Sequence, residues 1–362
     1  MQNDKRRIAV GLSGGVDSAV AAALLKRAGY EVLAVTMQLG SGRISFDDKK
    51  CSACFGPGQA QEIDAARAAA AYLEIPHAVI PLADEFEDKV LGYYRREYLA
   101  GRTPNPCVVC NALIKFGALR EAAAKTGFNC GLLATGHYAR VDYDARQRLF
   151  LLRQGIDPAK DQSYFLHRLN QAQLAAIVFP LGDRLKRDVI AEAKRIGLPR
   201  VTEKKESRDF LQKDDHSFLF AGHPGRPGPI LDTKGKRIGT HRGIIHYTIG
   251  QRSGLGGGAG RRYVKEIRAK NNTIVIGERN EILALQTSVR DINWIAKKPP
   301  AKEFAGLARL RYRQAGVHCQ VTTENSGARV VFDEPQFAVT PGQAAVFYRG
   351  DEVLGGGWIV IP

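Results

Sequence analysis

A glycine- and serine-rich string, Ser13-Gly14-Gly15-Val16-Asp17-Ser18, stands between an apolar run and an alanine-rich segment. Glycines let backbone N–H groups come close to a phosphate, and the start of a following helix adds the positive end of its dipole. Ser13 and Ser18 can donate further hydrogen bonds, while Asp17 can hold Mg²⁺ or cap the helix. The string has no G-K-[ST], so it is not a Walker A loop. The alternative is an ordinary glycine turn with a Ser or Asp N-cap.

Four of the six cysteines form two C-x-x-C pairs, Cys51–Cys54 and Cys107–Cys110. Such pairs can hold a tetrahedral Zn²⁺ or a [4Fe–4S] cluster, or they can form a redox disulfide. A disulfide scaffold is not expected in a chain of this length. Cys130 and Cys319 fall in apolar or β-rich segments, where we expect buried structural thiols.

The first 200 residues alternate short apolar runs with segments of helical spacing. Such alternation predicts βαβ units and a doubly wound parallel sheet in an α/β fold. Ligands bind such sheets beyond the carboxyl ends of the strands, so the phosphate loop and both cysteine pairs are expected at one edge. The predicted strands cover residues 8–12, 31–37, 77–82 and 130–136, and the predicted helices cover 17–28, 59–73, 112–126 and 185–196.

After Arg200 glycine and proline become frequent, and helical periodicity nearly disappears. This change predicts two small β-rich domains or barrels. We therefore expect three domains, covering residues 1–205, 206–285 and 286–362. The predicted C-terminal strands cover 273–278, 308–313, 318–323, 328–332 and 344–348.

The chain carries 53 Lys and Arg against 37 Asp and Glu, a formal net charge of +16. Such a balance attracts polyanions and favours nucleic acid, although a basic surface without a ligand or an anionic membrane would account for the charge alone. No apolar run is long enough to span a membrane, and the N-terminus MQNDKRRIAV leads straight into a strand. We expect a cytoplasmic protein with no membrane partner.

The string S-G-G-x-D-S after the first strand resembles the PP-loop ATP pyrophosphatase superfamily, whose members cleave ATP to AMP and pyrophosphate. Four further stretches are similar to the tRNA-specific 2-thiouridylases over nearly the full chain. Other PP-loop enzymes, such as argininosuccinate synthase or a glutamine-dependent amidating ligase, are not expected to carry them. These stretches are GRTPNPCVVCNALIKFG (101–117), ATGHYAR (134–140), KDQSYFL (160–166) and HYTIGQRSGLG (246–256).

The resemblance implies a role for particular residues. Cys110, Asp17 and Cys107 would be catalytic. The residues implied to contact ATP are Gly11, Leu12, Ser13, Gly14, Gly15, Val16, Asp17, Ser18, Met37 and Gly136, with a plain core methionine as the alternative for Met37. The residues implied to contact tRNA or its extruded base are Asn105, Pro106, Cys107, His137, Lys160, Asp161, Gln162, Arg311, Tyr312 and Gln343. Asp161 could instead only anchor a loop.

The cysteine pattern departs from the family. The second family cysteine normally follows an E-S-x-x-x-C string and carries a persulfide, but here Glu206-Ser207 leads to Leu211. Leucine has no nucleophile, so sulfur must arrive by another route. Our hypothesis is a [4Fe–4S] cluster held by three or four of Cys51, Cys54, Cys107 and Cys110, with a structural Zn²⁺ or a redox disulfide as alternatives.

The implied reaction is 2-thiouridine synthesis, at the wobble uridine by analogy. ATP with Mg²⁺ would adenylate O2, and sulfur from a donor protein or inorganic sulfide would then replace it. Two rivals remain open: a PP-loop enzyme for a small metabolite, and a tRNA-binding homologue that has lost catalysis.

Overall fold

The computed structural model of the chain describes residues 6–44, 46, 53–198, 210–211, 216–220, 222, 225–255 and 261–360. The chain divides into two compact units, each assembled from separate stretches. The first comprises Met1–Lys89, Cys107–Asp214 and Asp351–Val353, and the second comprises Val90–Pro106, Asp215–Gly350 and Leu354–Pro362. The predicted three-domain division at 205 and 285 partitions the chain differently and stays a prediction.

The first unit is built on a five-stranded parallel sheet of order β3-β2-β1-β4-β7. After β1 the chain adds strands on one side and later returns to add β4 and β7 on the other, which is the doubly wound topology that the sequence predicted. β1 lies at the centre, where Ile8 pairs with Val32 of β2 and with Leu132 of β4. The strand bounds are β1 Arg7–Gly11, β2 Glu31–Gln38, β3 His77–Pro81, β4 Leu132–Ala134 and β7 Ile177–Val178.

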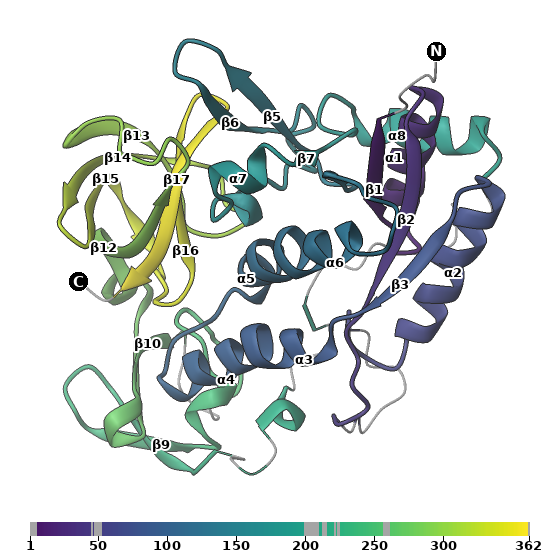
Figure 1. Ribbon diagram of the computed structural model, residues 1–362. Coiled ribbons are helices and arrows are strands. Elements are labelled where there is room, and N and C mark those ends of the chain that lie inside the picture. Colours follow the sequence, from purple (N-terminus) through teal and green to yellow (C-terminus); the bar gives the residue numbers. More distant parts are fainter. Residues whose placement is uncertain are drawn as a thin grey trace. The chain divides into compact units, whose positions relative to one another are not determined.

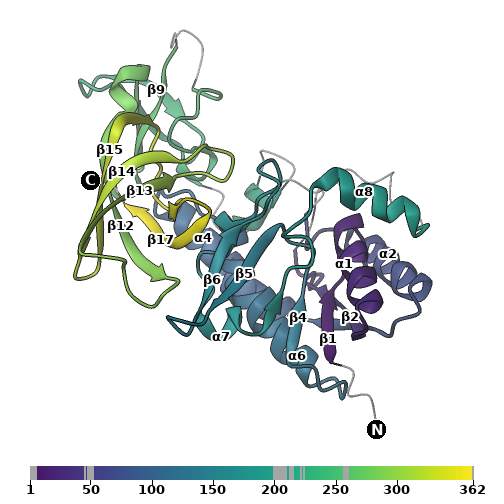
Figure 2. The same cartoon turned by 90° about the horizontal axis from the view of Figure 1, so that it is seen from above.

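Apolar runs explain why these segments are central strands, since both faces of a parallel sheet are covered. Ile8 and Val10 are fully buried in a cluster with Ala22 and Leu25 of α1 and Ala66 of α2. Figures 1 and 2 show α1, α2 and α8 on one side of the strands and α5 and α6 on the other. The bounds of these helices are α1 Val16–Arg27, α2 Gln59–Tyr72, α5 Pro106–Cys110, α6 Arg120–Ala124 and α8 Lys186–Arg195.

The four predicted helices are confirmed, with one change of geometry. The segment predicted as a helix over 112–126 contains a π-helix, Asn111–Leu119, between α5 and α6. π-Helical turns are rare in proteins, and those that do occur often lie at functional sites. The sequence did not predict the helical stretch that contains α3 (Ala83–Phe86), a π-turn (Glu87–Leu91) and α4 (Gly92–Leu99).

A hairpin follows β4 in the first unit. β5 (Ala139–Asp144) pairs antiparallel with β6 (Leu149–Gln154), and β6 also pairs with Glu352 and Val353. A 3-10 turn (Ser163–Leu166) and α7 (Gln171–Leu174) then lead into β7. Neither strand of the hairpin was predicted.

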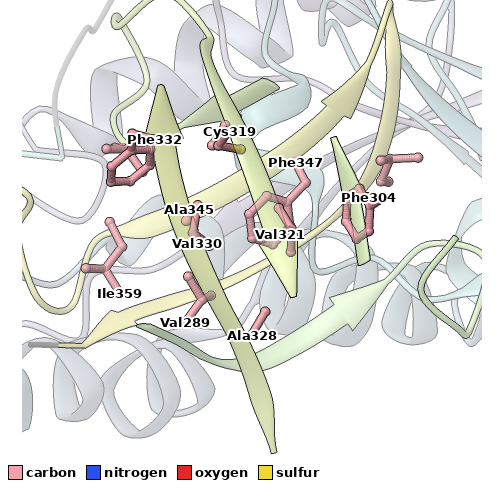
Figure 3. Packing of buried hydrophobic residues seen from close by; sticks show 13 residues of the cluster. Val289, Phe304, Cys319, Val321, Ala328, Val330, Phe332, Ala345, Phe347 and Ile359 are labelled. Carbon is pink, nitrogen blue, oxygen red and sulfur yellow. The ribbon is translucent and has the colours of Figure 1, made fainter. Parts of the chain in front are cut away.

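The second unit is β-rich, as predicted. One sheet has the order β10-β11-β8-β9, and a further set of strands closes into a barrel because β12 pairs with both β15 and β17. Figure 3 shows the barrel core, a single buried cluster in which Phe347 lies beside Val321 and which also contains Phe332. The bounds are β8 Gly228–Leu231, β9 Arg237–His241, β10 Tyr263–Arg268, β11 Thr273–Gly277, β12 Leu283–Trp294, β13 Glu303–Arg309, β14 Val317–Glu324, β15 Gly327–Phe337, β16 Ala344–Arg349 and β17 Glu352–Val360.

The strand predicted over 308–313 is wrong beyond Arg309. Arg309 pairs with Val346 of β16 and ends β13, after which the chain turns. Arg311 in that turn donates from its guanidinium to the Ala338 carbonyl (2.6 Å), so an interaction outside the ladder holds it. Within the described parts of the chain, no helix combines the length and apolar character needed to span a bilayer.

The buried His167 should make folding sensitive to acid. Burial lowers the pKa of His167 to about 3, although its Nδ1 lies 2.8 Å from the Tyr164 carbonyl. The folded chain keeps this ring neutral, whereas the unfolded chain protonates it below its ordinary pKa, so the stabilisation is complete at pH 7.5 and is lost as the pH falls. We expect His167 to reduce the free energy of unfolding by about 2 kcal/mol between pH 7.5 and pH 5.

Urea unfolding at the two pH values measures this effect, with His167→Gln as the comparison. The variant should lose less stability than the wild type over the same pH interval. An equal loss in both proteins would contradict the assignment.

Candidate active site

The Ser13–Ser18 turn follows β1 at the point where the sheet order reverses between β1 and β4, the place where doubly wound sheets bind ligands. Gly14 has φ +72°, and a Cβ there would lie 2.7 Å from the Glu62 carbonyl of α2. Ser13 N–H donates to Ser18 Oγ (3.2 Å), and Ser18 Oγ donates to the Gly15 carbonyl (3.0 Å). The turn is therefore held in shape by its own side chains and backbone, with α1 beginning at Val16.

Gly136 packs directly on the start of α1. It follows β4, and a Cβ at this position would lie 2.8 Å from both the Asp17 carbonyl carbon and the Ser18 nitrogen. Only glycine lets the loop after β4 approach the first helical turn this closely. The predicted ATP residues from Gly11 to Ser18 and Gly136 thus lie together, and their contact with ATP stays a prediction.

Asp17 is held by two residues distant in sequence. Lys186 Nζ lies 2.6 and 2.7 Å from the two carboxylate oxygens, and the Tyr138 hydroxyl donates to Oδ1 (2.9 Å). Gly15, not Asp17, is the N-cap of α1, and it makes no side-chain cap. A magnesium role for Asp17 would therefore require Lys186 to move.

No sequence motif indicates that Lys186 contacts Asp17, because 169 positions separate the two residues. As an ammonium beside the phosphate turn, it can balance the charge of Asp17 or of a bound phosphate.

The loop after β2 is tied to α2 by one amide. Met37, near the end of β2, is half-buried. Gln59 Oε1 accepts from the N–H groups of Leu39 and Gly40 at 2.9 and 2.8 Å, and Gln59 Nε2 donates to the Cys54 carbonyl at 2.6 Å. Gln59 thus holds Cys54 of the first cysteine pair near the end of the strand. Cys51 lies outside the described residues.

Three thiols share one electrostatic environment. Burial raises the pKa of Cys54 well above its ordinary value, and the thiolates of Cys110 and then Cys107 raise it further. Cys54 nevertheless keeps solvent-accessible surface, while Cys107 is half-buried and Cys110 is buried. The charges of Cys107 and Cys110 therefore act at Cys54, while the convergence of the two complete C-x-x-C pairs stays a prediction.

Lys115 adds a positive charge to this environment, and it was not among the predicted site residues. It lies in the π-helix after α5 and lowers the pKa of Cys54 and of Cys110, partly offsetting burial. Lys115 lies five residues after Cys110 in the GRTPNPCVVCNALIKFG stretch, and this position could have indicated that it lies near the thiols. An ammonium near a thiol favours the reactive thiolate.

His137 connects the cysteine helix to the phosphate turn. It directly follows Gly136, and its ring lies 5.7 Å from that of Phe116 in the same π-helix as Lys115. Burial, followed by the charge of Lys115, lowers the pKa of His137 well below its ordinary value. The ring is therefore neutral near pH 7 and does not provide a cation for a tRNA phosphate.

A metal cluster is not formed by the described part of the chain. Among those residues, no three His, Cys, Asp or Glu side chains are arranged to hold a metal ion. The proposed cluster on Cys51, Cys54, Cys107 and Cys110 includes one residue outside the described set. It stays a hypothesis, and the geometry of the other three does not fit a metal centre.

Several residues predicted to contact tRNA serve the fold. Asp161 is buried and accepts from the backbone N–H groups of Gly155 and Ser163, both at 3.1 Å. Gln162 Oε1 accepts from the Tyr138 N–H at 3.0 Å. The loop-anchoring alternative thus describes the Asp161 carboxylate. Lys160 beside them is half-exposed.

The remaining predicted contacts lie in the second unit. Gln343 Nε2 donates to the carbonyls of Thr103 and Pro104, each at 3.0 Å, so Gln343 supports the loop that leads to Asn105. Asn105 is buried, and its N–H donates to the Tyr93 hydroxyl at 3.2 Å. The next residue, Pro106, begins α5 with its two cysteines. Arg311 and Tyr312 are half-exposed.

Comparison with known proteins decides the family. Residues 6–212 match the family described as tRNA methyl transferase HUP domain, 216–278 its PRC-barrel domain, and 286–359 the aminomethyltransferase beta-barrel domain. The tRNA-specific 2-thiouridylase MnmA of Acetivibrio thermocellus is 41% identical, over 98% of this chain and 99% of that protein. The chain belongs to the tRNA-specific 2-thiouridylase family. The enzyme of the same name from Endomicrobium trichonymphae is 42% identical, over 98% of this chain and 99% of its own.

Among solved structures, NMN synthetase from Francisella tularensis is similar over 56% of this chain and 66% of its own. The TM-score is 0.34 at 19% identity, which is too low to support an argument. The 2-thiouridylase family, with its PP-loop fold and β-barrel domains, therefore stands on the sequence comparisons.

The close approach of Gly136 to α1 can be tested by substitution. Gly136→Ala places a methyl group against backbone atoms that cannot turn aside, so the phosphate turn must shift. We expect ATP binding, measured by calorimetry, to weaken by about tenfold or more. Gly131→Ala, with open space around its Cβ just before β4, is the matched control. Unchanged ATP affinity in Gly136→Ala would contradict this geometry.

The charge of Lys115 predicts the reactivity of Cys54. Lys115→Met removes a positive charge that lowers the Cys54 pKa, so less thiolate is present at pH 7.5. Alkylation of the Cys54 peptide by iodoacetamide, followed by mass spectrometry, should slow about three- to tenfold. Lys125→Met, at an exposed position after α6, serves as the control. Equal alkylation rates in all three proteins would show that Lys115 does not act on this thiol.

Proposed function

We propose that this chain is a tRNA 2-thiouridylase, which uses ATP to adenylate O2 of a uridine and then replaces that oxygen with sulfur. One observation carries the proposal. A glycine turn suited to a phosphate follows β1, and Gln59 ties Cys54, whose pKa the charges of Cys110 and Cys107 raise, to the end of the neighbouring strand β2. Adenylation needs the first feature, and sulfur transfer needs the second.

The phosphate turn fits ATP. The N-terminus of the twelve-residue helix α1 follows two glycines, so backbone donors and the helix dipole can face a phosphate. The hydroxyls of Ser13 and Ser18 and the ammonium of Lys186 add donors beside it. Asp17 would hold Mg²⁺ if Lys186 moved onto a phosphate oxygen. Met37, near the end of β2, would contact the adenine.

The nucleic-acid partner follows from charge and from the chemistry. A net charge of +16 favours a polyanion. The reacting C2 of a uridine is reached only when the base leaves its stack. In the proposal the extruded base, a wobble uridine by family analogy, lies near Asn105 and Pro106, which lead directly into the cysteine helix. Lys160, Arg311 and Tyr312 would contact the tRNA.

The reaction balances in two steps. O2 of the uridine attacks the α-phosphorus of ATP, and pyrophosphate leaves. Bound AMP turns a poor leaving oxygen into a good one. A sulfur nucleophile then attacks C2, the bond from C2 to the adenylated oxygen breaks, and AMP departs with that oxygen.

The names of the similar proteins imply two different reactions. The family of the N-terminal domain is described as a tRNA methyl transferase, whereas the full-length relatives are called 2-thiouridylases. Methyl transfer would require neither a phosphate-binding turn for ATP nor a group of three thiols. The site therefore favours thiolation.

The form of the sulfur source is a separate part of the proposal. A donor protein or inorganic sulfide would supply it, and the hypothesis of a [4Fe–4S] cluster, or of Zn²⁺, is kept only as an outcome of the test. Because the described thiols do not fit a metal centre, no step here depends on one. The free thiols of Cys54, Cys107 and Cys110 also favour a reducing, cytoplasmic location.

The test uses the purified chain with ATP, Mg²⁺, an unmodified tRNA transcript and a persulfide donor. Pyrophosphate release should require the tRNA and fall steeply with salt, and nucleoside mass spectrometry should detect 2-thiouridine. Gly136→Ala should release pyrophosphate and form 2-thiouridine more slowly than the wild type, and Gly131→Ala should match the wild type in both rates.

Other outcomes identify the rivals. ATP turnover without RNA would indicate a small-metabolite enzyme, and tRNA binding without 2-thiouridine would indicate lost catalysis; either result overturns the proposal. Repeating the assay on protein stripped of iron and zinc decides the sulfur route, since a cluster mechanism alone loses its activity.

A further inference from the structure

The position of the missing family cysteine can be located in the structure. Leu211, which stands there, forms an isolated antiparallel bridge with Ala53. Paired residues in such a bridge have Cα atoms about 4.5–5.5 Å apart, and the next residue along the chain is about 3.8 Å further. The residue after Ala53 is Cys54. A thiol is therefore present within one residue of the place where the family carries its second cysteine.

Aromatic packing fixes the two segments beside each other. The ring of Phe210, next to Leu211, lies 5.3 Å from that of Phe55, next to Cys54. Phe86 packs against both rings, at 5.4 Å from Phe55 and 6.4 Å from Phe210. Phe55 and Phe86 are buried, so this cluster holds the Ala53–Leu211 bridge in place.

The backbone of Cys54 is also fixed towards the nucleotide turn. Gln59, at the start of α2, donates to the Cys54 carbonyl. One turn further along α2 is Glu62, whose carbonyl packs against Gly14. A helical turn advances about 5.4 Å, so Cys54 and the phosphate turn contact neighbouring turns of one helix.

Cys54 and Cys110 differ in access. Cys54 is exposed, so a donor in solution can reach it, whereas Cys110 is buried. The negative charges of the Cys110 and Cys107 thiolates both raise the pKa of Cys54, and the charge of Cys110 has the larger effect. This arrangement suits an outer thiol that receives sulfur and an inner thiol that acts after it.

We propose that Cys54 is the residue that carries the transferable sulfur in this chain, in place of the cysteine that Leu211 cannot supply, and that Cys110 releases the product. The inference rests on the proposed function and names a further catalytic residue for it. It makes Cys54 a covalent carrier, not a metal ligand.

The chemistry needs a sulfane sulfur donor and a dithiol reductant. The Cys54 thiolate attacks the outer sulfur of a donor persulfide, and the donor leaves as a thiolate. The terminal sulfur on Cys54 then attacks C2 of the adenylated uridine, its proton passes to solvent, and AMP leaves with O2.

Release requires a second thiol. The Cys110 thiolate attacks the Cys54 sulfur, the bond to the uridine sulfur breaks, and its electron pair stays on the uridine as 2-thiouridine. The Cys54–Cys110 disulfide that remains takes two electrons and two protons from the dithiol, which restores both thiols.

Four proteins test the assignment: the wild type, Cys54→Ala, Cys54→Ala combined with Leu211→Cys, and Cys130→Ala as a buried-thiol control. Two rates are measured for each with tRNA, namely pyrophosphate release and 2-thiouridine formation from a small-molecule persulfide. Cys54→Ala should lose thiolation by about 100-fold or more while its single-turnover pyrophosphate release is kept. The added Leu211→Cys should restore most of the thiolation, and Cys130→Ala should match the wild type in both.

A separate measurement maps the sulfur. Wild-type protein treated with the persulfide, and analysed without reductant, should gain the mass of one sulfur atom on the Cys54 peptide. After one turnover it should yield a Cys54–Cys110 disulfide. This readout holds even if Cys54→Ala does not fold.

Three results would overturn the assignment: wild-type thiolation in Cys54→Ala, an equal loss of pyrophosphate release and thiolation in that variant, or transferable sulfur mapped only to other cysteines. Each of these leaves the proposed function standing if the wild type makes 2-thiouridine. Absence of 2-thiouridine from the wild type would instead refute the proposed function itself.

Discussion

Backbone packed directly against backbone around the first turn of α1 is the constraint on which the candidate site depends. Gly14 leaves no room for a side chain beside α2, and Gly136 leaves none beside Asp17 and Ser18. These two contacts fix α1, α2 and the loop after β4 around one anion-sized turn. From there α2 positions Cys54 through Gln59, and the loop after β4 continues into His137 and its contact with Phe116. The same packing therefore places both the nucleotide turn and the thiols.

Charge is distributed over this site by two lysines. Lys186 neutralises Asp17 at the phosphate turn, and Lys115 offsets the cost of thiolates at Cys54 and Cys110. Burial opposes Lys115 and prevails, so the pKa of Cys54 and that of Cys110 lie above the ordinary value of a thiol. This balance suits groups that must resist oxidation between turnovers, since thiolates and not thiols react.

Features encoded by local sequence could be predicted. The glycine turn and the strands of the parallel sheet follow from short strings and from the geometry of doubly wound sheets. The closed barrel could not be predicted in detail, because the β12–β17 pairing joins distant segments. The hairpin β5–β6 was missed because half of its residues are polar or exposed.

Side-chain roles set by distant partners were also out of reach. Nothing near Lys186 indicates that it binds Asp17, and nothing near Gln343 indicates that it supports Thr103 and Pro104. The resemblance suggested that Asp161 and Gln162 contact tRNA, yet in the fold both side chains bind backbone N–H groups. A motif marks a residue as constrained, and only its contacts show whether the constraint serves the ligand or the loop.

The central claim is that nucleotide and thiols share one site. Alkylation of Cys54 with and without a saturating, non-hydrolysable ATP analogue tests it most directly. We expect the bound analogue to slow alkylation of Cys54 severalfold in the wild type, and to have no effect in Gly136→Ala. An unchanged Cys54 rate, in wild-type protein shown by calorimetry to have bound the analogue, would contradict the account.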